Sequence, residues 1–348
     1  MKIKYHLSLL LIGFLGVVHA QQTIDQINLN AIKPNSINKF WLQLADDGLS
    51  RPIAVPVIIL KGSEPSPVLG ITAAIHGNEL NGIAVIQQVL DEIDMDKFKG
   101  TLIAIPGLNA VGLELHQRDF IDDQDLNRIF PGKKNGNRSQ QYAYQIKTKI
   151  LPKLDYLIDL HTASFGRINS LYTRGDLSND TIRAMTLLQD CDIVLNNKGV
   201  PSAGMQSDDS RTMRAEAILM GKPSITVELG NPQVFQPEMI ARGKTGIKNV
   251  LSWLKMIPDS IQKVVKPVMC KKSYWVYTDS GGYLEVRVNL RDEIKKDQLI
   301  AILRNPFGEI IKKYFSPEDG IVIGKSSNPV TMSGGRIIHL GILDKNSQ

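Results

Sequence analysis

From residue 67 to residue 256, short apolar runs alternate with segments in which apolar residues recur at helical spacing. The runs "PVLGITAAI" (67–75) and "LDYLIDLHTAS" (154–164) are typical of strands that are buried on both faces of a sheet. The segments "NGIAVIQQVLDEI" (81–93) and "MIARGKTGIKNVLSWLKM" (239–256) have helical periodicity. Buried strands that alternate with helices predict an α/β fold, with helices on both faces of a largely parallel sheet.

The remaining elements follow the same pattern. Residues 37–62 contain two apolar runs around an Asp47-Gly48 turn, which predicts a hairpin. Further strands are predicted at 100–109 and 222–230, and further helices at 140–154 and 181–191. In folds of this class, binding and catalytic side chains gather at the carboxyl ends of the strands.

The pattern changes after Pro258. From Pro267 onward the sequence holds short strands separated by turns, such as "GGYLEVRVNL" and "GGRIIHLGIL", and it shows no helical period. This change predicts a catalytic domain over residues 21–258 and a small C-terminal all-β domain over residues 266–348, which is within the normal range of domain sizes.

The N-terminus has the layout of a cleaved secretory signal peptide. It has a basic start at Lys2 and Lys4, an apolar run over residues 7–18 and small residues shortly before Gln21. We therefore expect residues 1–20 to be removed and the mature protein to be periplasmic or secreted; a retained N-terminal anchor is the alternative. No later segment is long and apolar enough to span a membrane, so no span is expected after cleavage.

Composition excludes two kinds of site. Without Lys2 and Lys4, basic residues fall from 41 to 39 against 35 acidic ones, which leaves a mature net charge of about +4. This excess is small and no basic stripe with aromatic residues accompanies it, so nucleic acid is not an expected partner. The two cysteines, Cys191 and Cys270, are too few for a cysteine-based zinc site. Whether they form a disulfide stays open at this stage.

Histidines at two strand ends point to a metal site. His76 ends one predicted strand, and Glu79 follows it three residues later, in what we expect to be the first turn of the next helix. Gly77 allows the tight bend between them. Two histidines and one carboxylate are common ligands of catalytic zinc, and His161, at the next such strand end, is the best-placed second histidine. The sequence thus predicts one zinc ion per chain at His76, Glu79 and His161.

The two other histidines after residue 20 are weaker candidates. His116 lies in a loop-like segment, and His339 lies in the predicted β domain. A structural or surface role is the usual expectation for a single histidine.

The segment "DQDLNRIFPG" (123–132) holds three candidate site residues, Asp125, Asn127 and Arg128. Asp125 is suited to accept the free N–H of a ligating imidazole. Arg128 offers the planar fork that binds a carboxylate at two points. Arg118, ten residues earlier, is expected to enter the site and polarise a carbonyl oxygen. The alternative interpretation is a polar loop with a Pro-Gly turn.

Glu228 is the one charged residue in the apolar run "ITVELG". A carboxylate at such a strand end needs a cation, a metal or a hydrogen-bond donor, because an unpaired buried charge is costly. It is therefore the expected general base of a metal-dependent hydrolase. The alternative role is an ion pair with a structural arginine. The sequence contains no G-x-S-x-G, H-E-x-x-H, G-x-G-x-x-G or P-loop motif, so serine hydrolases, zincins and nucleotide-binding enzymes lack their usual signatures.

Four motifs together resemble the succinylglutamate desuccinylase/aspartoacylase family of the zinc carboxypeptidase superfamily. They are "HGNE", "DLNRIFPG", "DLHTAS" and "TVELG", in this order and spacing, and the resemblance extends over about residues 50–345. It implies a mixed sheet with helices on both faces and hydrolysis of the amide bond of an N-acylated amino acid.

The resemblance also implies roles for individual residues. His76, Glu79 and His161 would be the zinc ligands, and Glu228 would activate water and protonate the leaving amine. Arg118 would assist at the oxyanion. Asn127 and Arg128 would bind the carboxylate of a small-molecule substrate. Three further arginines are candidates for substrate contacts: Arg167, Arg174 and Arg214.

The C-terminal segment is similar to a biotinyl/lipoyl-type barrel. The stretch "SPEDGIVIG" stands where such barrels carry a modified lysine, but no lysine occupies the turn. We therefore expect a barrel-like cap or rim of the active site.

Two other functions stay open. The runner-up is an exported metallocarboxypeptidase that acts on peptides or cell-wall fragments, and the third is an inactive binding protein that keeps the fold. The best-known deacylases of the family are cytoplasmic, so the predicted export leaves the acyl group and the amino acid of the substrate open.

Overall fold

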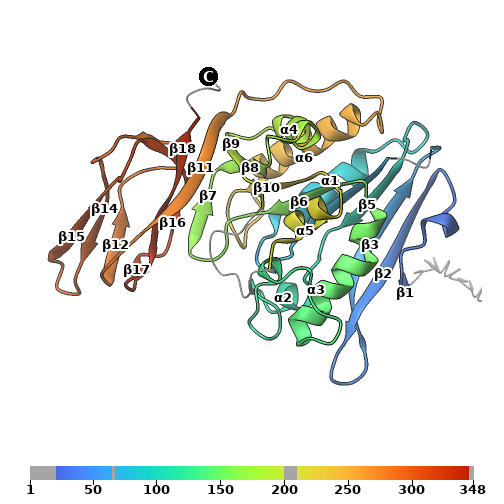
Figure 1. Cartoon of the computed structure of the whole chain (residues 1–348), viewed down its shortest axis with the longest axis horizontal. Coiled ribbons are helices and arrows are strands. Elements are labelled where there is room, and N and C mark those ends of the chain that lie inside the picture. Colours follow the sequence, from blue (N-terminus) through green and yellow to red (C-terminus); the bar gives the residue numbers. More distant parts are fainter. Residues whose placement is uncertain (1–20, 65–66, 200–209, 345–348) are drawn as a thin grey trace, which may run out of the picture.

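The computed structural model describes residues 21–64, 67–199 and 210–344, so the predicted signal peptide, residues 1–20, lies outside the described residues. The architecture is α/β, with one large mixed sheet and a smaller antiparallel sheet at the C-terminal end (Figure 1). The predicted fold class is confirmed.

The large sheet holds 14 strands in the described part of the chain. They are β1 (Gln22–Ile24), β2 (Ser36–Asp46), β3 (Pro52–Lys61), β4 (Val68–Ala73), β5 (Thr101–Ile105), β6 (Tyr156–His161), β7 (Arg167–Asn169), β8 (Leu171–Gly175), β9 (Ile193–Asn196), β10 (Ser224–Leu229), β11 (Val268–Tyr277), β13 (Glu293–Ile294), β16 (Gly320–Ser326) and β18 (Arg336–Leu343). Their order is β1-β2-β3-β5-β4-β6-β10-β8-β9-β11-β18-β16-β13, and β7 pairs with β16.

The centre of this sheet is parallel, as the buried apolar runs predict. Strand β4 pairs in parallel with β5 and β6, and β6 pairs in parallel with β10. Outside this centre, β3 is antiparallel to β5 and β8 is antiparallel to β10. Because the sheet as a whole combines parallel and antiparallel pairs, the expectation of a largely parallel sheet is wrong, whereas the mixed sheet that the resemblance implied is confirmed.

Helices cover both faces of the sheet (Figure 1). The helices are α1 (Asn81–Glu92), α2 (Ala110–Glu114), α3 (Arg138–Lys149), α4 (Asp180–Leu187), α5 (Met213–Leu219) and α6 (Pro237–Trp253), with 3-10 turns η1 (Leu29–Ala31), η2 (Leu126–Arg128) and η3 (Leu151–Lys153). Helices α1, α4 and α6 bury their apolar faces in one core, and α3 and α5 do so in a second core. In the described chain no helix is long and apolar enough to cross a membrane.

The C-terminal segment adds a four-stranded antiparallel sheet to the end of the main sheet. Its strands are β12 (Gly282–Val286), β14 (Leu299–Arg304), β15 (Ile310–Phe315) and β17 (Val330–Thr331), in the order β15-β14-β12-β17. A separate apolar core, with Leu284, Leu303 and Leu340 among its members, lies between this sheet and the strands β16 and β18. We call residues 268–343, which form these strands with β11 and β13, the C-terminal module.

The main sheet continues into the C-terminal module without a break. Strand β11 pairs in parallel with β9, with Val268 opposite Ile193, and in antiparallel fashion with β18. Residues 258–267 between α6 and β11 contain neither helix nor strand. The predicted boundary between a catalytic domain and a C-terminal domain therefore does not coincide with a break in the sheet, and the division into two domains stays a prediction.

The turn after β4 differs from the expectation in two details. Helix α1 begins at Asn81, so Glu79 precedes the helix and lies in a turn in which its backbone N–H donates to the His76 carbonyl oxygen at 3.1 Å. The residue with left-handed backbone is Ala74, with φ of 56°. Gly77 is required for a different reason, because a Cβ there would lie 1.9 Å from the backbone carbonyl carbon of Gly112.

Candidate active site

Three predicted metal ligands meet at the carboxyl ends of β4 and β6. One ligand atom from each of His76, Glu79 and His161 lies within 4.8 Å of the others. The Glu79 carboxylate lies between the two imidazoles, with Oε1 2.9 Å from His76 Nδ1 and Oε2 2.8 Å from His161 Nδ1. All three side chains are buried. Both histidines therefore turn the same ring nitrogen toward one point.

A second carboxylate fixes the orientation of each imidazole. Asp159 Oδ2 lies 2.8 Å from His161 Nε2, and Asp125 Oδ1 lies 3.1 Å from His76 Nε2. A carboxylate on the far nitrogen of a ligating histidine is the usual arrangement in metal sites, since it sets the tautomer and leaves the near nitrogen free to bind. Asp125 thus makes the contact that its place in the sequence suggested.

The three side chains fit a divalent cation. His76 Nδ1 is buried, and within the described residues it makes no hydrogen bond of suitable geometry, although Glu79 Oε1 lies 2.9 Å away. Burial opposes the charged imidazole of His161, but Asp159 and Glu79 raise its pKa to about 10. Burial also opposes ionisation of Glu79, yet His76 and His161 hold the pKa of that carboxyl well below its usual value. Two imidazole nitrogens and an ionised carboxylate form the donor set of catalytic zinc sites.

Arg118 enters the site from the loop after α2. Its Nη1 donates to Glu79 Oε1 at 2.9 Å and its Nη2 to Asp125 Oδ2 at 2.8 Å. The buried Asn109 side chain fixes this loop, because its amide donates to the carbonyl oxygens of Ile75 and Asp119 at 3.2 and 3.3 Å. Arg118 therefore carries positive charge to a position between a metal ligand and the carboxylate behind His76.

Asn127 and Arg128 lie on η2, beside the metal ligands. Asp125 caps this turn by accepting from the Asn127 backbone N–H at 2.9 Å. Asn127 Oδ1 accepts from the Met213 backbone N–H at 2.8 Å, so the amide nitrogen of the same side chain turns toward His161 Nε2, 3.5 Å away. Arg128 is partly buried, and both side chains line the same pocket as the metal ligands.

Glu228 lies on β10, directly opposite His161 on the neighbouring strand β6. Its Oε1 lies 3.2 Å from Arg174 Nη2, and its Oε2 accepts from Asn169 Nδ2 at 3.3 Å. The Tyr172 hydroxyl also contacts Arg174. The cation that such a strand-end carboxylate requires is thus Arg174, on the antiparallel neighbour β8.

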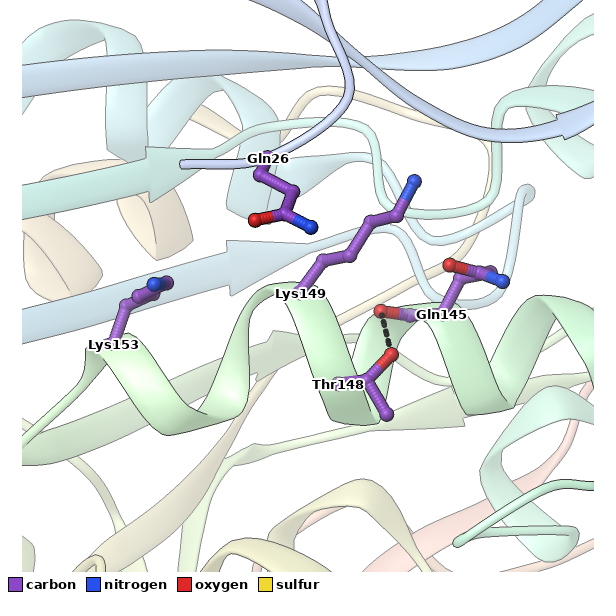
Figure 2. A pocket seen from close by; sticks show the side chains of 5 residues that line it. All are labelled: Gln26, Gln145, Thr148, Lys149 and Lys153. Atoms are coloured by element: carbon purple, nitrogen blue, oxygen red, sulfur yellow. Dashed lines mark hydrogen bonds between the residues drawn. The ribbon is translucent and has the colours of Figure 1, made fainter. Parts of the chain in front are cut away.

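One pocket of about 470 Å³ contains all the predicted site residues. One wall comes from the C-terminal module, through Trp275, Arg336 and His339. A separate pocket of about 190 Å³ is lined by Gln26 and by four polar residues of α3 and η3, namely Gln145, Thr148, Lys149 and Lys153 (Figure 2). The predicted metal ligands and the carboxylates Asp125 and Glu228 line the larger pocket and not the smaller one.

Sequence reasoning did not find several residues of this pocket. Asn169 and Tyr172 lie on the short strands β7 and β8, which lack a long apolar run. The place of His339 in the predicted β domain favours a structural role, yet this residue lines the pocket wall. Trp275 and Arg336 come from strands whose position depends on long-range pairing. The arginines of "GRINSLYTRG" were the one local signal, since Arg167 and Arg174 both line the pocket.

Residues 65–254 match the family model of the succinylglutamate desuccinylase/aspartoacylase catalytic domain, which covers more than half of the chain. The chain belongs to the succinylglutamate desuccinylase/aspartoacylase family. The membership that four motifs predicted is confirmed. The protein is an amidohydrolase of this family, a deacylase of N-acylated amino acids, and its His-Glu-His triad is typical of the zinc-binding family.

Similar proteins agree with this membership in the succinylglutamate desuccinylase/aspartoacylase family. The chain is 26% identical over 265 residues to N-alpha-acetyl-L-2,4-diaminobutyric acid deacetylase from Halomonas elongata. The aligned region covers 74% of this chain and 75% of the relative. The product-bound structure of the ectoine utilization protein EutE (DoeB) from Ruegeria pomeroyi is similar in fold, with a TM-score of 0.81 and 21% identity over 93% of this chain and 100% of that chain. A family protein from Rhodobacter sphaeroides has a TM-score of 0.79 at 19% identity, over 92% of this chain and 98% of that chain.

Proposed function

We propose that the protein is a zinc-dependent deacylase whose substrate is an N-acyl amino acid with a free carboxylate beside the scissile amide. The observation that carries this proposal is the convergence of the His76, Glu79 and His161 ligand atoms in one pocket with Glu228, Asn127 and Arg128. The relative from Halomonas elongata, whose name denotes removal of an N-acetyl group from an amino acid, supports it.

Zinc is the proposed metal. His76, Glu79 and His161 would hold it, each histidine through Nδ1, because Asp125 and Asp159 occupy the other ring nitrogens. When bound, zinc supplies a Lewis acid that polarises a carbonyl group and makes water more acidic. The mixed nitrogen and oxygen donor set suits zinc better than magnesium or calcium, which prefer oxygen ligands.

Glu228 is the proposed general base and acid. Arg174 and Asn169 each hold one oxygen of its carboxylate at the edge of the pocket. As water attacks the amide carbonyl carbon, Glu228 takes the proton of the water and later delivers it to the amine nitrogen, whose bond to carbon breaks. Arg118 places a guanidinium where negative charge develops on the carbonyl oxygen.

Asn127 and Arg128 are proposed to bind the substrate carboxylate. The Arg128 guanidinium can donate two parallel hydrogen bonds to a carboxylate, and the Asn127 amide nitrogen adds a donor beside it. A carboxylate in this place gains charge-assisted hydrogen bonds, which are stronger than those that a neutral group would form there.

One assay tests the function and separates it from a carboxypeptidase activity. The purified mature protein with zinc is offered N-acetyl amino acids, their carboxamides and short peptides, and kcat/KM is measured for each. We expect hydrolysis of the N-acetyl amino acids and much weaker hydrolysis of carboxamides and peptides. Peptides as the preferred substrates would instead establish a carboxypeptidase, and loss of all turnover in a zinc-loaded protein would establish a binding protein.

The role of Arg128 has its own variant in this assay. Arg128→Lys keeps the charge and loses the fork, so it should weaken catalysis on the carboxylate substrate by about 2 kcal/mol and affect the carboxamide far less. Arg183→Lys, on the exposed face of α4, is the matched control and should change neither value. A wild-type enzyme that cleaves carboxamide and acid equally well would remove Arg128 as a carboxylate reader.

We also propose that the protein is exported and begins near Gln21. The basic start, the apolar run and the small residues before Gln21 support this. N-terminal sequencing of protein from the envelope or medium of the native host tests it. An intact Met1 on most molecules would contradict it.

A further inference from the structure

The segment between β6 and β8 contacts both a proposed metal ligand and the proposed general base. At its start, the Thr162 backbone N–H donates to Glu79 Oε2 at 3.2 Å, and the Ser164 hydroxyl donates to Glu79 Oε1 at 2.7 Å. Near its end, Asn169 Nδ2 donates to Glu228 Oε2 at 3.3 Å. The position of this one segment therefore affects both carboxylates.

The C-terminal module fixes this segment through β7, which lies beside β16 (Figure 1). Asn169 pairs with Gly324 in antiparallel register. Ser170, the next residue, donates from its backbone N–H and from its hydroxyl to the Ile323 carbonyl oxygen, both at 2.9 Å. The module therefore determines where the backbone of Asn169 lies.

Gly324 leaves the space that the Asn169 side chain occupies. A Cβ at Gly324 would lie 2.3 Å from Asn169 Oδ1 and 3.0 Å from the Ile168 carbonyl oxygen. The shorter of these contacts is with the end of a side chain, so a larger residue at this position would first displace the Asn169 amide. Since Oδ1 lies over Gly324, Nδ2 of the same amide is turned toward Glu228. Gly324 thus permits the orientation in which Asn169 donates to the proposed base.

The Glu228 carboxylate needs a donor on each of its oxygens. The last torsion of a glutamate side chain is broad, so the chain itself does not fix the plane of the carboxylate. Arg174 Nη2 lies 3.2 Å from Oε1, and Asn169 donates to Oε2. Together the two donors fix the plane. A general base must point at the water that it deprotonates, and a small misplacement of a catalytic group lowers the rate strongly.

We infer that Asn169 is a positioning residue for the general base, and that the C-terminal module controls it through Gly324. The inference rests on the proposed function, because it takes Glu228 as the base. It deepens that function, since it gives the module a part in the chemical step in addition to its place in the pocket wall. Asn169 acts through Glu228, so its loss should lower kcat and leave KM and zinc affinity near their wild-type values.

The kinetic experiment uses zinc-loaded protein and the N-acetyl amino acid that the wild type hydrolyses fastest. Asn169→Ala should lower kcat about tenfold, the lower range for a lost hydrogen bond to a charged group, without a change in KM. Asn169→Asp keeps the shape but places a second carboxylate beside Glu228, so kcat should fall at least as far. The control is Asn249→Ala, which removes a buried amide of α6 that donates to the Leu188 and Gln262 carbonyl oxygens. This control should lower the stability and leave kcat unchanged.

Gly324→Ala tests the link to the C-terminal module. Its methyl group should turn the Asn169 amide away from Glu228 and lower kcat about as much as Asn169→Ala does. In the double variant the methyl group meets no amide, so kcat should equal that of Asn169→Ala alone. Gly48→Ala, at a turn where a Cβ meets no atom within 4 Å, is the matched control and should keep wild-type kcat. The same loss from Gly324→Ala in both backgrounds would overturn the link.

Crystal structures of the wild type and of Gly324→Ala give a second measurement that does not need turnover. In the variant, Asn169 Nδ2 should lie beyond hydrogen-bonding distance of Glu228 Oε2, and the carboxylate plane should be rotated, while the metal ligands keep their places. An unchanged Glu228 carboxylate overturns the inference. A higher KM at constant kcat in Asn169→Ala also overturns it, because that result would assign Asn169 to substrate binding.

The outcomes separate this inference from the proposed function. If Glu228→Gln loses turnover while Asn169→Ala and Gly324→Ala keep wild-type kcat, the function stands and the inference is overturned. If the zinc-loaded wild type hydrolyses no N-acyl amino acid, the deacylase function is overturned. A rotated Glu228 carboxylate in the Gly324→Ala crystal structure would then still support the control of Glu228 by the module.

Discussion

Asp159 Oδ2 lies 2.8 Å from His161 Nε2, two residues away on the same strand. Side chains at this spacing point to the same side of a strand, so β6 supplies both a metal ligand and the carboxylate that orients it. Thr72 Oγ1 on the neighbouring strand β4 donates to the other Asp159 oxygen at 2.7 Å. The Asp159 carboxylate is thus fixed from both sides.

Asp159→Asn should lower zinc affinity by about 10- to 100-fold, the usual effect of removing a carboxylate behind a ligating histidine. Competition with a chelator of known affinity measures this. Asp94→Asn, which removes an exposed carboxylate paired with Lys97, is the control and should bind zinc as the wild type does. Unchanged affinity in Asp159→Asn would show that the Asp159 carboxylate does not support the metal site.

Zinc uptake should release about one proton per ion from His161 near neutral pH. Its pKa of about 10 in the metal-free protein means that this imidazole is protonated there and must lose a proton to bind. Zinc affinity should therefore rise with pH up to about 10. Calorimetry in buffers with different ionisation enthalpies counts the protons, and affinity independent of pH would contradict the prediction.

The raised pKa of His161 has the opposite effect on the stability of the metal-free protein, which should fall as pH rises. The pKa of His161 is raised from 6.5 to about 10 in the folded state, so the imidazolium stabilises the metal-free protein fully below pH 6.5. This contribution declines as pH rises toward 10. The midpoint of urea unfolding, measured with a chelator present, should follow this course, with other titrating groups corrected by the His161→Gln variant.

Glu228→Gln should bind zinc normally and lose at least about 10²-fold in kcat, because the amide cannot take the proton of the attacking water. Glutamine has the same shape as glutamate and keeps an oxygen that can accept from Asn169 Nδ2, so the fold should persist. Elemental analysis and steady-state kinetics on one preparation separate the two effects. Wild-type turnover in this variant would exclude Glu228 as the base.

Gly77→Ala should destabilise the protein by about 1–3 kcal/mol or more and weaken zinc binding, because the added methyl group meets the backbone of Gly112. Gly48→Ala is the control, since a Cβ at this hairpin turn meets no atom within 4 Å. Urea unfolding and zinc content measure both variants. Equal stability of the two would contradict the close approach of Gly77 and Gly112.

Cys191 and Cys270 should remain free thiols even after export. Both are buried, and the sheet places Cys270 opposite Leu195, four residues beyond Cys191. Burial raises the pKa of Cys191 to about 11 and that of Cys270 to about 12, so both should react slowly in the folded protein. A thiol reagent should count two thiols after unfolding without reductant, and fewer would indicate a disulfide.

The sequence predicted those parts of the fold that long apolar runs define. Strands β4, β6 and β10 bring His161 and Glu228 to neighbouring strand ends, so local pattern and topology rules were enough to place both. The sequence predicts a tight bend at Gly77, whereas the structure explains this glycine by its packing against Gly112, a contact that leaves no local signal in the sequence.

Local sequence patterns could not predict the residues that form the wall of the pocket. Arg174 lies on β8, a strand of five residues, and its contact with Glu228 depends on the antiparallel register of β8 and β10. Trp275 and Arg336 reach the pocket only because β7 pairs with β16 and β11 pairs with β9. Pairings between such distant segments leave no periodic signal in the chain.

The pairing of β9 with β11 governs what happens when the molecule is shortened. A chain that stops at residue 258 lacks β11, so one side of Ile193–Asn196 loses the partner that its N–H and C=O groups have in the intact protein. Three buried apolar residues, Ile193, Val194 and Leu195, would lie along that open edge. Open apolar edges recruit strands from other chains. The shortened protein would therefore aggregate as intermolecular sheets, and the C-terminal module keeps the sheet soluble as much as it shapes the pocket.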